Sequence, residues 1–380
     1  MNSLEMTENA YHSSRTYRIF IVDKNTPRMY PFCTRGIERR SVMTNKNGSS
    51  SGQPEVYLVT GGAGMLGRAI VSQLVERGKT VRVIDIETAA DDRAEIIVGD
   101  VRDTEDVRKA CEGVDTVIHA AAAVWDPNLP PTIYYDTNVT GTQLIIDTCV
   151  QLGVPRLVYT STMDVIMDGK HGQRLADESL PYPADYTKMD QYAYSKMLGE
   201  QAVIKANGEA FSTCALRSAG MYGPGDKYHV PNIIKNAKHG MNIRLGNGKA
   251  QFSHVFSGNV AYAHILAAEH LVPDSPVSGQ AYFITDHDTG NFFDFMNPFL
   301  KQMSISEPKI SIPHGIANTL AWFAEKLSPR SNFNRFSIYC ICVDHTFVHD
   351  KATRDFDYQP IFSAEEAFEI TLEWLKTQEF

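Results

Sequence analysis

From residue 56 onward, short apolar runs alternate with longer segments in which apolar residues recur every three or four positions. The short runs predict buried strands, and the longer segments predict amphipathic helices. The first unit is a strand at 56–60, a helix at 66–77 and a second strand at 80–84. Further strands are predicted at 95–98, 116–119, 156–160 and 212–216, and further helices at 104–111, 135–152 and 190–206. Strands that alternate with helices in this way predict an α/β fold with a doubly wound parallel sheet.

Two regions flank this pattern. Residues 1–54 have no clear periodicity, carry eight Lys/Arg and four Asp/Glu, and end in the Gly- and Ser-rich segment 45–54. We expect a basic, disordered extension there; an organelle transit peptide is the alternative, which the acidic residues disfavour. The pattern becomes less regular after about residue 220, so we assign 55–220 to the core and 221–380 to a smaller substrate-binding region interleaved with it. Ligands of open α/β sheets bind beyond the carboxyl ends of the strands.

Composition and charge exclude several classes of protein. The 380 residues include 36 Lys/Arg and 45 Asp/Glu, a net charge of −9, which gives no basic footprint for nucleic acid. Six scattered cysteines without CxxC pairs predict no metal site and a reducing compartment. The longest apolar segments, 316–327 and 336–343, fall short of the ~18 residues that a membrane span needs, and the second also fits a buried strand. We expect a cytoplasmic protein without an integral span, and leave open peripheral contact with the endoplasmic reticulum membrane and a homodimer.

The turn after the first strand has the features of a phosphate-binding loop. It reads TGGAGMLG, and five of its residues are predicted to bind a cofactor: Gly61, Gly64, Met65, Leu66 and Gly67. Glycine is needed because the turn is tight, a pyrophosphate approaches the backbone and the helix packs closely on the strand. The N–H groups at the helix N-terminus favour the phosphate. Residues 55–220 are therefore predicted to be a Rossmann core that binds a dinucleotide.

An acidic residue and two short segments extend this predicted cofactor site. Asp85 ends the second strand, where a carboxylate accepts hydrogen bonds from the adenosine ribose and repels a 2′-phosphate, so NAD is favoured over NADP. A cap of the strand end is the plainer alternative for Asp85. Asp100 and Val101 are predicted to hold the adenine, while Ala120 and Ala121 are small enough to let the dinucleotide cross the sheet.

A tyrosine and a lysine four residues apart form the candidate catalytic pair. Tyr192 and Lys196 share a helix face, and an adjacent ammonium lowers the pKa of a phenol, which is ordinarily ~10. Tyr192 is therefore a candidate general acid/base, although a surface pair is the plainer interpretation if it stands alone. It does not stand alone, because the strand at 156–160 runs into two hydroxyls. Thr162 is preferred for binding the same substrate oxygen, with Ser161 as the alternative.

These motifs together resemble a known family. TGGAGMLG, Asp85, HAAA, TNVTGT, YTST and YAYSK, in this order, are similar to an extended short-chain dehydrogenase/reductase over roughly residues 55–378. Further segments, RLVYTST, ADESLPYP, TCALRSAGMYGPGD and LGNGKAQF among them, resemble the 3β-hydroxysteroid dehydrogenase family, in particular family 42E and the sterol-4α-carboxylate 3-dehydrogenases. The thirty-residue interval from Thr162 to Tyr192 fits that family and supports Thr162 over Ser161.

The resemblance implies NAD-dependent oxidation of a steroid or sterol 3β-hydroxyl to the ketone, followed by decarboxylation if the substrate carries a 4α-carboxylate. It implies that Tyr192 transfers the hydroxyl proton, Lys196 lowers the pKa of Tyr192 and holds the nicotinamide ribose, and Thr162 orients the substrate oxygen. The chain departs from the family pattern at Ser218, which replaces a proline, and at Ser257 and Gly258, which replace a hydrophobic–acidic pair.

Further residues of the chain have candidate roles, and two other functions are compatible with the motifs. Trp125 and Met221 follow strand ends and are predicted to line an apolar substrate site, whereas His119 is predicted to be a packed strand-end histidine. A nucleotide-sugar epimerase or dehydratase is the alternative function; it needs cations for a diphosphate, and the substrate region has only scattered ones. A non-catalytic NAD-binding regulator is a third possibility, which the intact Tyr192, Lys196 and Thr162 disfavour.

Overall fold

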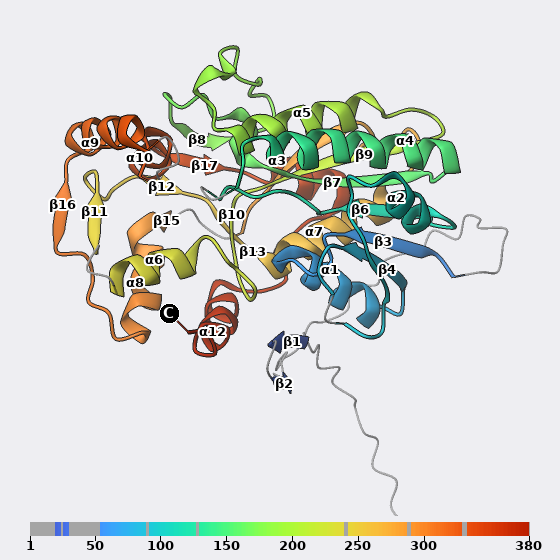
Figure 1. The fold of residues 1–380 in the computed structure, drawn as a ribbon, viewed down its shortest axis with the longest axis horizontal. Helices are drawn as coiled ribbons and strands as arrows, with labels where there is room; N and C mark the ends of the chain where they lie inside the picture. Colours follow the sequence, from blue (N-terminus) through green and yellow to red (C-terminus); the bar gives the residue numbers. More distant parts are fainter. Residues whose placement is uncertain are drawn as a thin grey trace, which may run out of the picture. The chain divides into compact units, whose positions relative to one another are not determined.

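Parallel strands connected by helices form the centre of the structure (Figure 1). The computed structural model describes residues 20–23, 26–29, 54–88, 91–126, 129–238, 242–286, 290–328 and 333–379. The chain divides into two units, Met1–Gln53 and Pro54–Phe380. Among the described residues of the second unit, seven parallel strands pair in the order β14-β9-β7-β6-β3-β4-β5. This order, in which the chain starts at a central strand and winds outward in both directions, confirms the predicted doubly wound sheet.

The strands begin close to where the sequence predicts them. They are β3 (Val56–Thr60), β4 (Thr80–Asp85), β5 (Glu95–Val98), β6 (Thr116–His119), β7 (Arg156–Thr162), β9 (Ser212–Ser218) and β14 (Gln280–Ile284). The predicted ends of β7 and β9 were too early by two residues each. The two strands pair in register as far as Thr162 opposite Ser218, so both predicted hydroxyls, at 161 and 162, belong to the strand itself.

Side chains that alternate along each strand enter two core layers, one on each face of the sheet. Leu58 packs with α2 (Thr104–Cys111), α4 (Thr142–Leu152) and α5 (Gln191–Lys205). Its neighbour Val59 packs on the opposite face with α1 (Met65–Glu76) and α7 (Ser257–His270). Figure 1 shows α4 and α5 on one side of the strands and α1 and α7 on the other. Both faces are thus covered, as a buried parallel sheet requires.

The predicted helix at 135–152 is interrupted. It consists of α3 (Thr132–Tyr135), a π-helical turn η1 (Asp136–Gly141) and α4. Within the turn, the buried Asn138 accepts a hydrogen bond from Ala123 N (2.8 Å) and donates one to Ser195 Oγ (2.9 Å). The wider turn aligns this amide with a loop and with α5, and such turns occur at functional sites.

The C-terminal part both completes the core and adds smaller elements. Strand β14 and helix α7 belong to the central sheet and its core layer although they follow residue 220; the boundary at 220 stays a prediction. The added helices are α6 (Val230–Lys238), α8 (Phe292–Gln302), α9 (His314–Leu327), α10 (Arg335–Cys342), α11 (Asp350–Phe356) and α12 (Ala364–Leu375). Short strands β8 (Gln173–Ala176), β12 (Gln251–Phe252), β15 (Gly290–Asn291) and β17 (His345–Phe347) form a second sheet. Two parallel pairs join β10 (Gly220–Tyr222) to β13 (His254–Phe256) and β11 (Ile243–Leu245) to β16 (Ile310–Ile312).

The first unit contains one short antiparallel pair, β1 (Phe20–Asp23) and β2 (Thr26–Met29). The sequence pattern does not predict this pair, because neither strand has a long enough alternation of apolar and polar residues. The rest of the predicted extension lies outside the described residues.

Candidate active site

The glycine turn leaves no room for side chains between β3 and α1. Gly61 has a φ of +70°, and a Cβ there would lie 2.7 Å from Ala121 Cα. A Cβ on Gly67 would overlap the carbonyl oxygen of Gly61. In the described structure, no side chain caps the first turn of α1, whose N-cap is Gly64. Backbone N–H groups at the start of a twelve-residue helix, in a turn without Cβ atoms, fit the pyrophosphate of a dinucleotide.

Asp85 faces this turn. Its Oδ2 accepts a hydrogen bond from Ala63 N (2.8 Å) and its Oδ1 accepts one from Glu87 N (2.9 Å). The carboxylate therefore also acts as the cap that the plainer interpretation assigned to it. Arg68 is held nearby through Nε, which donates to Ala63 O (2.6 Å), and the charges of Glu87 and Asp85 partly offset the lowering of its pKa by burial. The site thus offers two carboxylates and one guanidinium near the position predicted for the adenosine ribose.

The other predicted cofactor residues line the neighbouring strand ends. Ala121 N donates to Thr60 Oγ1 (3.0 Å), which holds the small-residue segment after β6 against β3. Val101 is buried, while the Asp100 carboxylate pairs with Arg102 (2.5 Å), which lowers the pKa of Asp100. Any contact between Asp100 and adenine would have to coexist with this ion pair.

Helix α5 and strand β7 bring the three predicted catalytic residues together. The side chain of Thr162, the last residue of β7, lies close enough to the Tyr192 hydroxyl to influence its pKa, whereas the buried Oγ of Ser161 has no hydrogen-bond partner among the described residues. Lys196 Nζ donates to the carbonyl oxygen of Thr160 (2.6 Å) and lies 4.0 Å from the centre of the Tyr159 ring. The spacing of four along α5 therefore places the phenol near Thr162 and the ammonium at Thr160, two residues earlier on the same strand.

The pKa of Tyr192 moves in the opposite direction from the prediction. Burial raises the pKa of its hydroxyl, the charges of Asp164 and Asp190 raise it further, and the interaction with the Thr162 side chain opposes them. Burial also lowers the pKa of Lys196 to about 7, against the effect of Glu200. Desolvation and two carboxylates dominate here because each disfavours the phenolate.

Two acids next to the candidate catalytic residues were not identified from the sequence. Asp164 lies two residues after Thr162, in the 3-10 turn η2 (Met163–Ile166), and its N–H donates to Thr162 Oγ1 (3.3 Å). Asp190 is the N-cap of α5 and accepts a hydrogen bond from Ala193 N (2.7 Å). Burial raises the pKa of Asp164 to about 6 and that of Asp190 to about 7. Their signal in the sequence is an acid just past a strand end and an acid at a helix start, which are also common structural positions.

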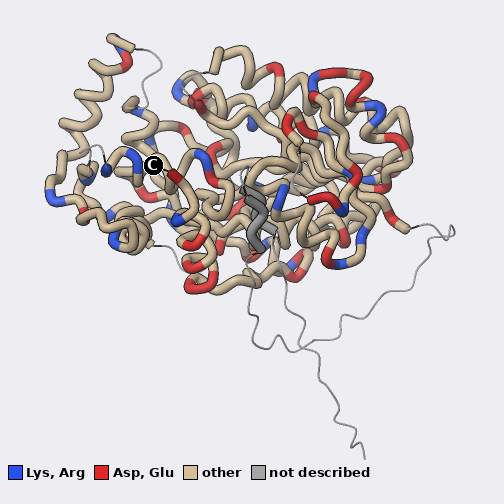
Figure 2. The backbone as a smooth tube through the Cα atoms, turned by 60° about the horizontal axis from the view of Figure 1, so that its bottom comes forward, with Lys and Arg blue, Asp and Glu red and all other residues tan. Residues whose placement is uncertain are grey.

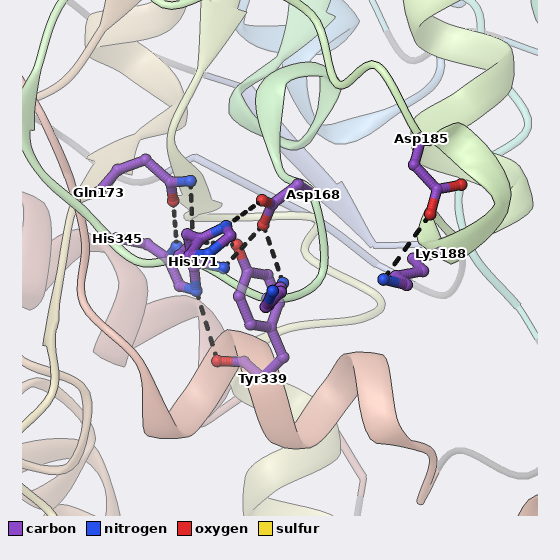
Figure 3. Close-up of polar contacts among 8 residues, drawn as sticks. Asp168, His171, Gln173, Asp185, Lys188, Tyr339 and His345 are labelled. Carbon is purple, nitrogen blue, oxygen red and sulfur yellow. Dashed lines mark hydrogen bonds and ion pairs between the residues drawn. The ribbon is translucent and has the colours of Figure 1, made fainter.

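Helix α10 is fixed beside this region by the contacts drawn in Figure 3. Tyr339 Oη donates to His171 O (2.7 Å), and His345 is hydrogen-bonded to Gln173 Oε1 (2.8 Å) and to Tyr339 O (3.3 Å). His171 also pairs with Asp168 at 2.5 Å. These bonds attach α10 to the loop that follows η2.

The interpretation of 336–343 as a strand was wrong, because Asn334 caps a helix there by accepting a hydrogen bond from Ser337 N (2.8 Å). The helix brings Cys340 within reach of Asp164 and Asp190, whose charges add to burial in raising the pKa of the thiol. A C-terminal helix thus lies against the two acids that adjoin Tyr192.

His119 has the packed role that was predicted. It is buried, and its ring nitrogens are hydrogen-bonded to Thr60 Oγ1 (2.7 Å) and Thr142 Oγ1 (3.0 Å). Burial lowers the pKa of His119 to about 3, with a smaller effect of Lys196. Trp125, after β6, and Met221, in β10, are both half-buried; their contact with substrate stays a prediction.

The fold and these residues define an extended short-chain dehydrogenase/reductase, and comparison with known proteins narrows the class. Residues 58–314 match the 3-beta hydroxysteroid dehydrogenase/isomerase family, and the chain belongs to that family. Its members are oxidoreductases that act on CH–OH groups with NAD or NADP. The predicted family is confirmed.

Several curated relatives cover most of the chain. The sterol-4-alpha-carboxylate 3-dehydrogenase, decarboxylating, of Mus musculus is 35% identical over 83% of this chain and 89% of its own length. The short-chain dehydrogenase/reductase family 42E member 1 of the same organism is 34% identical over 85% of this chain and 87% of its own length. A Thermus thermophilus UDP-glucose 4-epimerase solved with NAD has a TM-score of 0.63 at 20% identity, over 85% of this chain and 100% of that one. The last similarity shows the fold alone.

Within the part of the chain that the structure describes, no helix is both long enough and apolar enough to cross a membrane.

Proposed function

We propose that this protein oxidises the 3β-hydroxyl of a steroid or sterol to a ketone with NAD. The observation that carries the proposal is that Thr162, Tyr192 and Lys196 come together at the end of β7 in a chain of the 3-beta hydroxysteroid dehydrogenase/isomerase family. Two hydroxyls that meet at one point bind a single substrate oxygen, and a phenol among them exchanges its proton.

Each residue of the site would have a separate role in the oxidation. Thr162 and Tyr192 hold the substrate oxygen, and Tyr192 takes its proton. Bound NAD supplies the hydride acceptor. Lys196, anchored on Thr160 O, places a positive charge between the phenol and the position predicted for the nicotinamide ribose. The rate acceleration would come mainly from the orientation of the reacting groups, because they are fixed on a strand and a helix rather than on loops.

We propose NAD rather than NADP on the basis of the charges near the ribose position. Asp85 and Glu87 lie within electrostatic reach of Arg68 and are fixed by backbone hydrogen bonds around the turn. A 2′-phosphate would meet both carboxylates, whereas the ribose hydroxyls of NAD donate hydrogen bonds to one of them.

We further propose that the substrate is a 4α-carboxysterol. Relatives at about one-third identity carry the name sterol-4-alpha-carboxylate 3-dehydrogenase, decarboxylating. Oxidation at C3 of such a substrate gives a β-keto acid, which loses carbon dioxide readily, so the protein need catalyse only the oxidation.

We also propose that the protein works at a membrane surface, at the endoplasmic reticulum in a cell that has one. Helix α9 turns four apolar side chains outward on one face, Ile316, Leu320, Phe323 and Leu327, with exposed fractions from 46% to 87%. Its inner face packs through Ala317 and Ala321. Helix α9 carries only two charged residues, Glu325 and Lys326, both near its end (Figure 2). An apolar helix face of this kind fits the boundary between headgroups and acyl chains, where a sterol substrate also lies.

The first experiment measures NADH formation at 340 nm with NAD or NADP against 3β-hydroxysteroids and 4α-carboxysterols. We expect turnover with NAD in the wild type and none in Tyr192→Phe. Redox-neutral turnover of a nucleotide sugar, with no net NADH, would instead favour the epimerase or dehydratase alternative. NAD binding without turnover in either assay would favour a regulatory protein.

Membrane contact is tested separately by flotation with liposomes. Phe323→Asp should reduce binding at least tenfold, because it places a charge on the apolar face of α9. Val150→Asp is the matched control, since Val150 is equally exposed on α4. Equal binding of both variants would overturn the membrane proposal and leave the enzymatic one unaffected.

A further inference from the structure

A continuous hydrogen-bond network passes through His119, the last residue of β6. On one side of the ring, Ala121 N donates to Thr60 Oγ1 (3.0 Å), and Thr60 Oγ1 is hydrogen-bonded to His119 Nδ1 (2.7 Å). On the other side, His119 Nε2 is hydrogen-bonded to Thr142 Oγ1 (3.0 Å), which donates to the carbonyl oxygen of Asn138 (2.8 Å). The network thus runs from the segment that follows β6 to the π-helical turn η1.

The side-chain amide of Asn138 extends the network to the helix that carries Tyr192. Its Nδ2 donates to Ala123 O (3.0 Å) and to Ser195 Oγ (2.9 Å), while its Oδ1 accepts from Ala123 N (2.8 Å). Ser195 Oγ in turn donates to the carbonyl oxygen of Tyr192 (2.8 Å). The segment at Ala121 is therefore connected to the backbone of α5 through η1.

The hydrogen bonds assign the position of each proton around His119. The Thr142 hydroxyl gives its single proton to Asn138 O, so it accepts from His119, and Nε2 carries the ring proton. Nδ1 then accepts the hydroxyl proton of Thr60, whose oxygen accepts from Ala121 N. Burial lowers the pKa of His119 to about 3, with a smaller effect of Lys196, so this neutral tautomer persists near neutral pH.

Solvent cannot replace any of these bonds. Thr60, His119 and Thr142 are fully buried, and Asn138 and Ser195 are 1% and 2% exposed. A buried group that loses its partner has no water to bond instead, so each bond of the network is costly to break. A displacement at one end is therefore passed along the network, because no link can exchange its partner for solvent.

We propose that His119 is a positioning residue that couples the bound dinucleotide to the placement of Tyr192. This rests on the function proposed above, in which the dinucleotide lies on the glycine turn and crosses Ala120 and Ala121. That segment abuts the turn, since a Cβ on Gly61 would lie 2.7 Å from Ala121 Cα. A cofactor bound there restrains Ala121, and the network carries the restraint through His119 to η1 and α5.

The first experiment compares the kinetic constants of four proteins, the wild type and three variants. His119→Phe keeps a ring but removes both hydrogen bonds. Its kcat for alcohol oxidation should fall by about tenfold or more, because small displacements of reacting groups are costly. Its KM for the steroid and its affinity for NAD should change by less than about threefold, because the interaction acts on the reacting geometry and not on binding. His119→Gln, which offers one acceptor and one donor, should recover part of kcat.

Thr116→Val is the matched control. Thr116 begins the same strand and is fully buried, and its Oγ1 has no hydrogen-bond partner among the described residues. This variant should retain the kcat of the wild type. All rates are measured well below the melting temperature of each variant, so that unfolded protein does not contribute. An unchanged kcat in His119→Phe would show that His119 serves packing alone and would overturn the positioning role.

The second experiment measures the coupling without turnover. Saturating NAD should slow the hydrogen exchange of amides 136–141 by about threefold or more in the wild type and in Thr116→Val. In His119→Phe, NAD should still bind but leave this exchange unchanged. Equal slowing in His119→Phe and the wild type, or none in either, would overturn the coupling. Coupled exchange in a wild type that oxidises no 3β-hydroxysteroid or carboxysterol would instead overturn the proposed function and support the coupling through His119.

Discussion

Lys196 donates a hydrogen bond from Nζ to the carbonyl oxygen of Thr160, 2.6 Å away, and this bond joins the middle of α5 to β7 two residues before Thr162. The lysine is 2% exposed, so the position of its ammonium group is set by the bond to the strand and not by contact with solvent. Because Tyr192 lies four residues before Lys196 on α5, the same bond also fixes the position of Tyr192 relative to Thr162, the third residue of the candidate site.

Removal of this lysine tests that relation. Lys196→Met keeps the length of the side chain but leaves Thr160 O without its donor, and we expect a loss of stability of about 1–3 kcal/mol together with a fall in kcat of at least 100-fold. Lys205→Met is the control, because Lys205 ends the same helix and is exposed. Denaturant unfolding and NADH formation measure the two effects. Full activity in Lys196→Met would exclude the lysine from the reaction.

A second prediction concerns the glycine turn. Gly67→Ala should abolish NAD binding, because its Cβ would overlap Gly61 O and displace the turn against α1. Gly315→Ala, in the first turn of α9, is the matched control, because a Cβ there meets nothing within 4 Å. Quenching of protein fluorescence by NAD gives the affinities. Tight NAD binding by Gly67→Ala would show that the cofactor lies elsewhere.

The raised pKa of Asp164 also predicts how stability depends on pH. Burial raises the pKa of Asp164 to about 6 in the folded protein, whereas the ordinary pKa of 3.8 applies in the unfolded chain. Between these values the folded state binds more protons, so the contribution of Asp164 to stability is full below pH 3.8 and is lost as the pH rises through 6.

Asp164→Asn removes this dependence. Its melting temperature should rise relative to the wild type when the pH is raised from 5 to 8, because asparagine carries no charge to desolvate. Asp177→Asn serves as control, since Asp177 lies on the surface. If the two variants keep a constant difference in melting temperature across this range, Asp164 does not titrate as the structure indicates.

The fold was predictable where the order of residues fixes local structure. The runs at β3, β4 and β6 are apolar, and each ends at a glycine, an acid or small residues that cannot extend it, so their bounds followed from the sequence. Tyr192, Lys196 and Thr162 were identified by spacing along one helix and by position after one strand. All of these signals lie within a few tens of residues.

What the sequence did not reveal depends on contacts between distant segments. Asp164 and Asp190 look like ordinary turn and cap residues, and their raised pKa values arise from burial in the folded chain and, for Asp190, also from the charge of Asp164. The π-helical turn at Asn138 is associated with hydrogen bonds between this residue and both Ala123 and Ser195, which lie in other segments of the chain. Helix α10 is eight residues long, too short for its apolar pattern to distinguish a helix from a strand.

The choice between NAD and NADP gives the last prediction. Asp85→Asn keeps an oxygen that can accept the hydrogen bond from Ala63 N (2.8 Å) and removes the charge that faces the ribose position. The ratio of kcat/KM for NADP to that for NAD should rise at least tenfold, since Arg68 would then meet a 2′-phosphate with one carboxylate fewer nearby. Arg68→Gln in addition should reverse that gain, because the phosphate would lose its cation. If Asp85→Asn weakens both cofactors equally, the carboxylate serves as a cap of the glycine turn, and the preference between the cofactors is set by other residues.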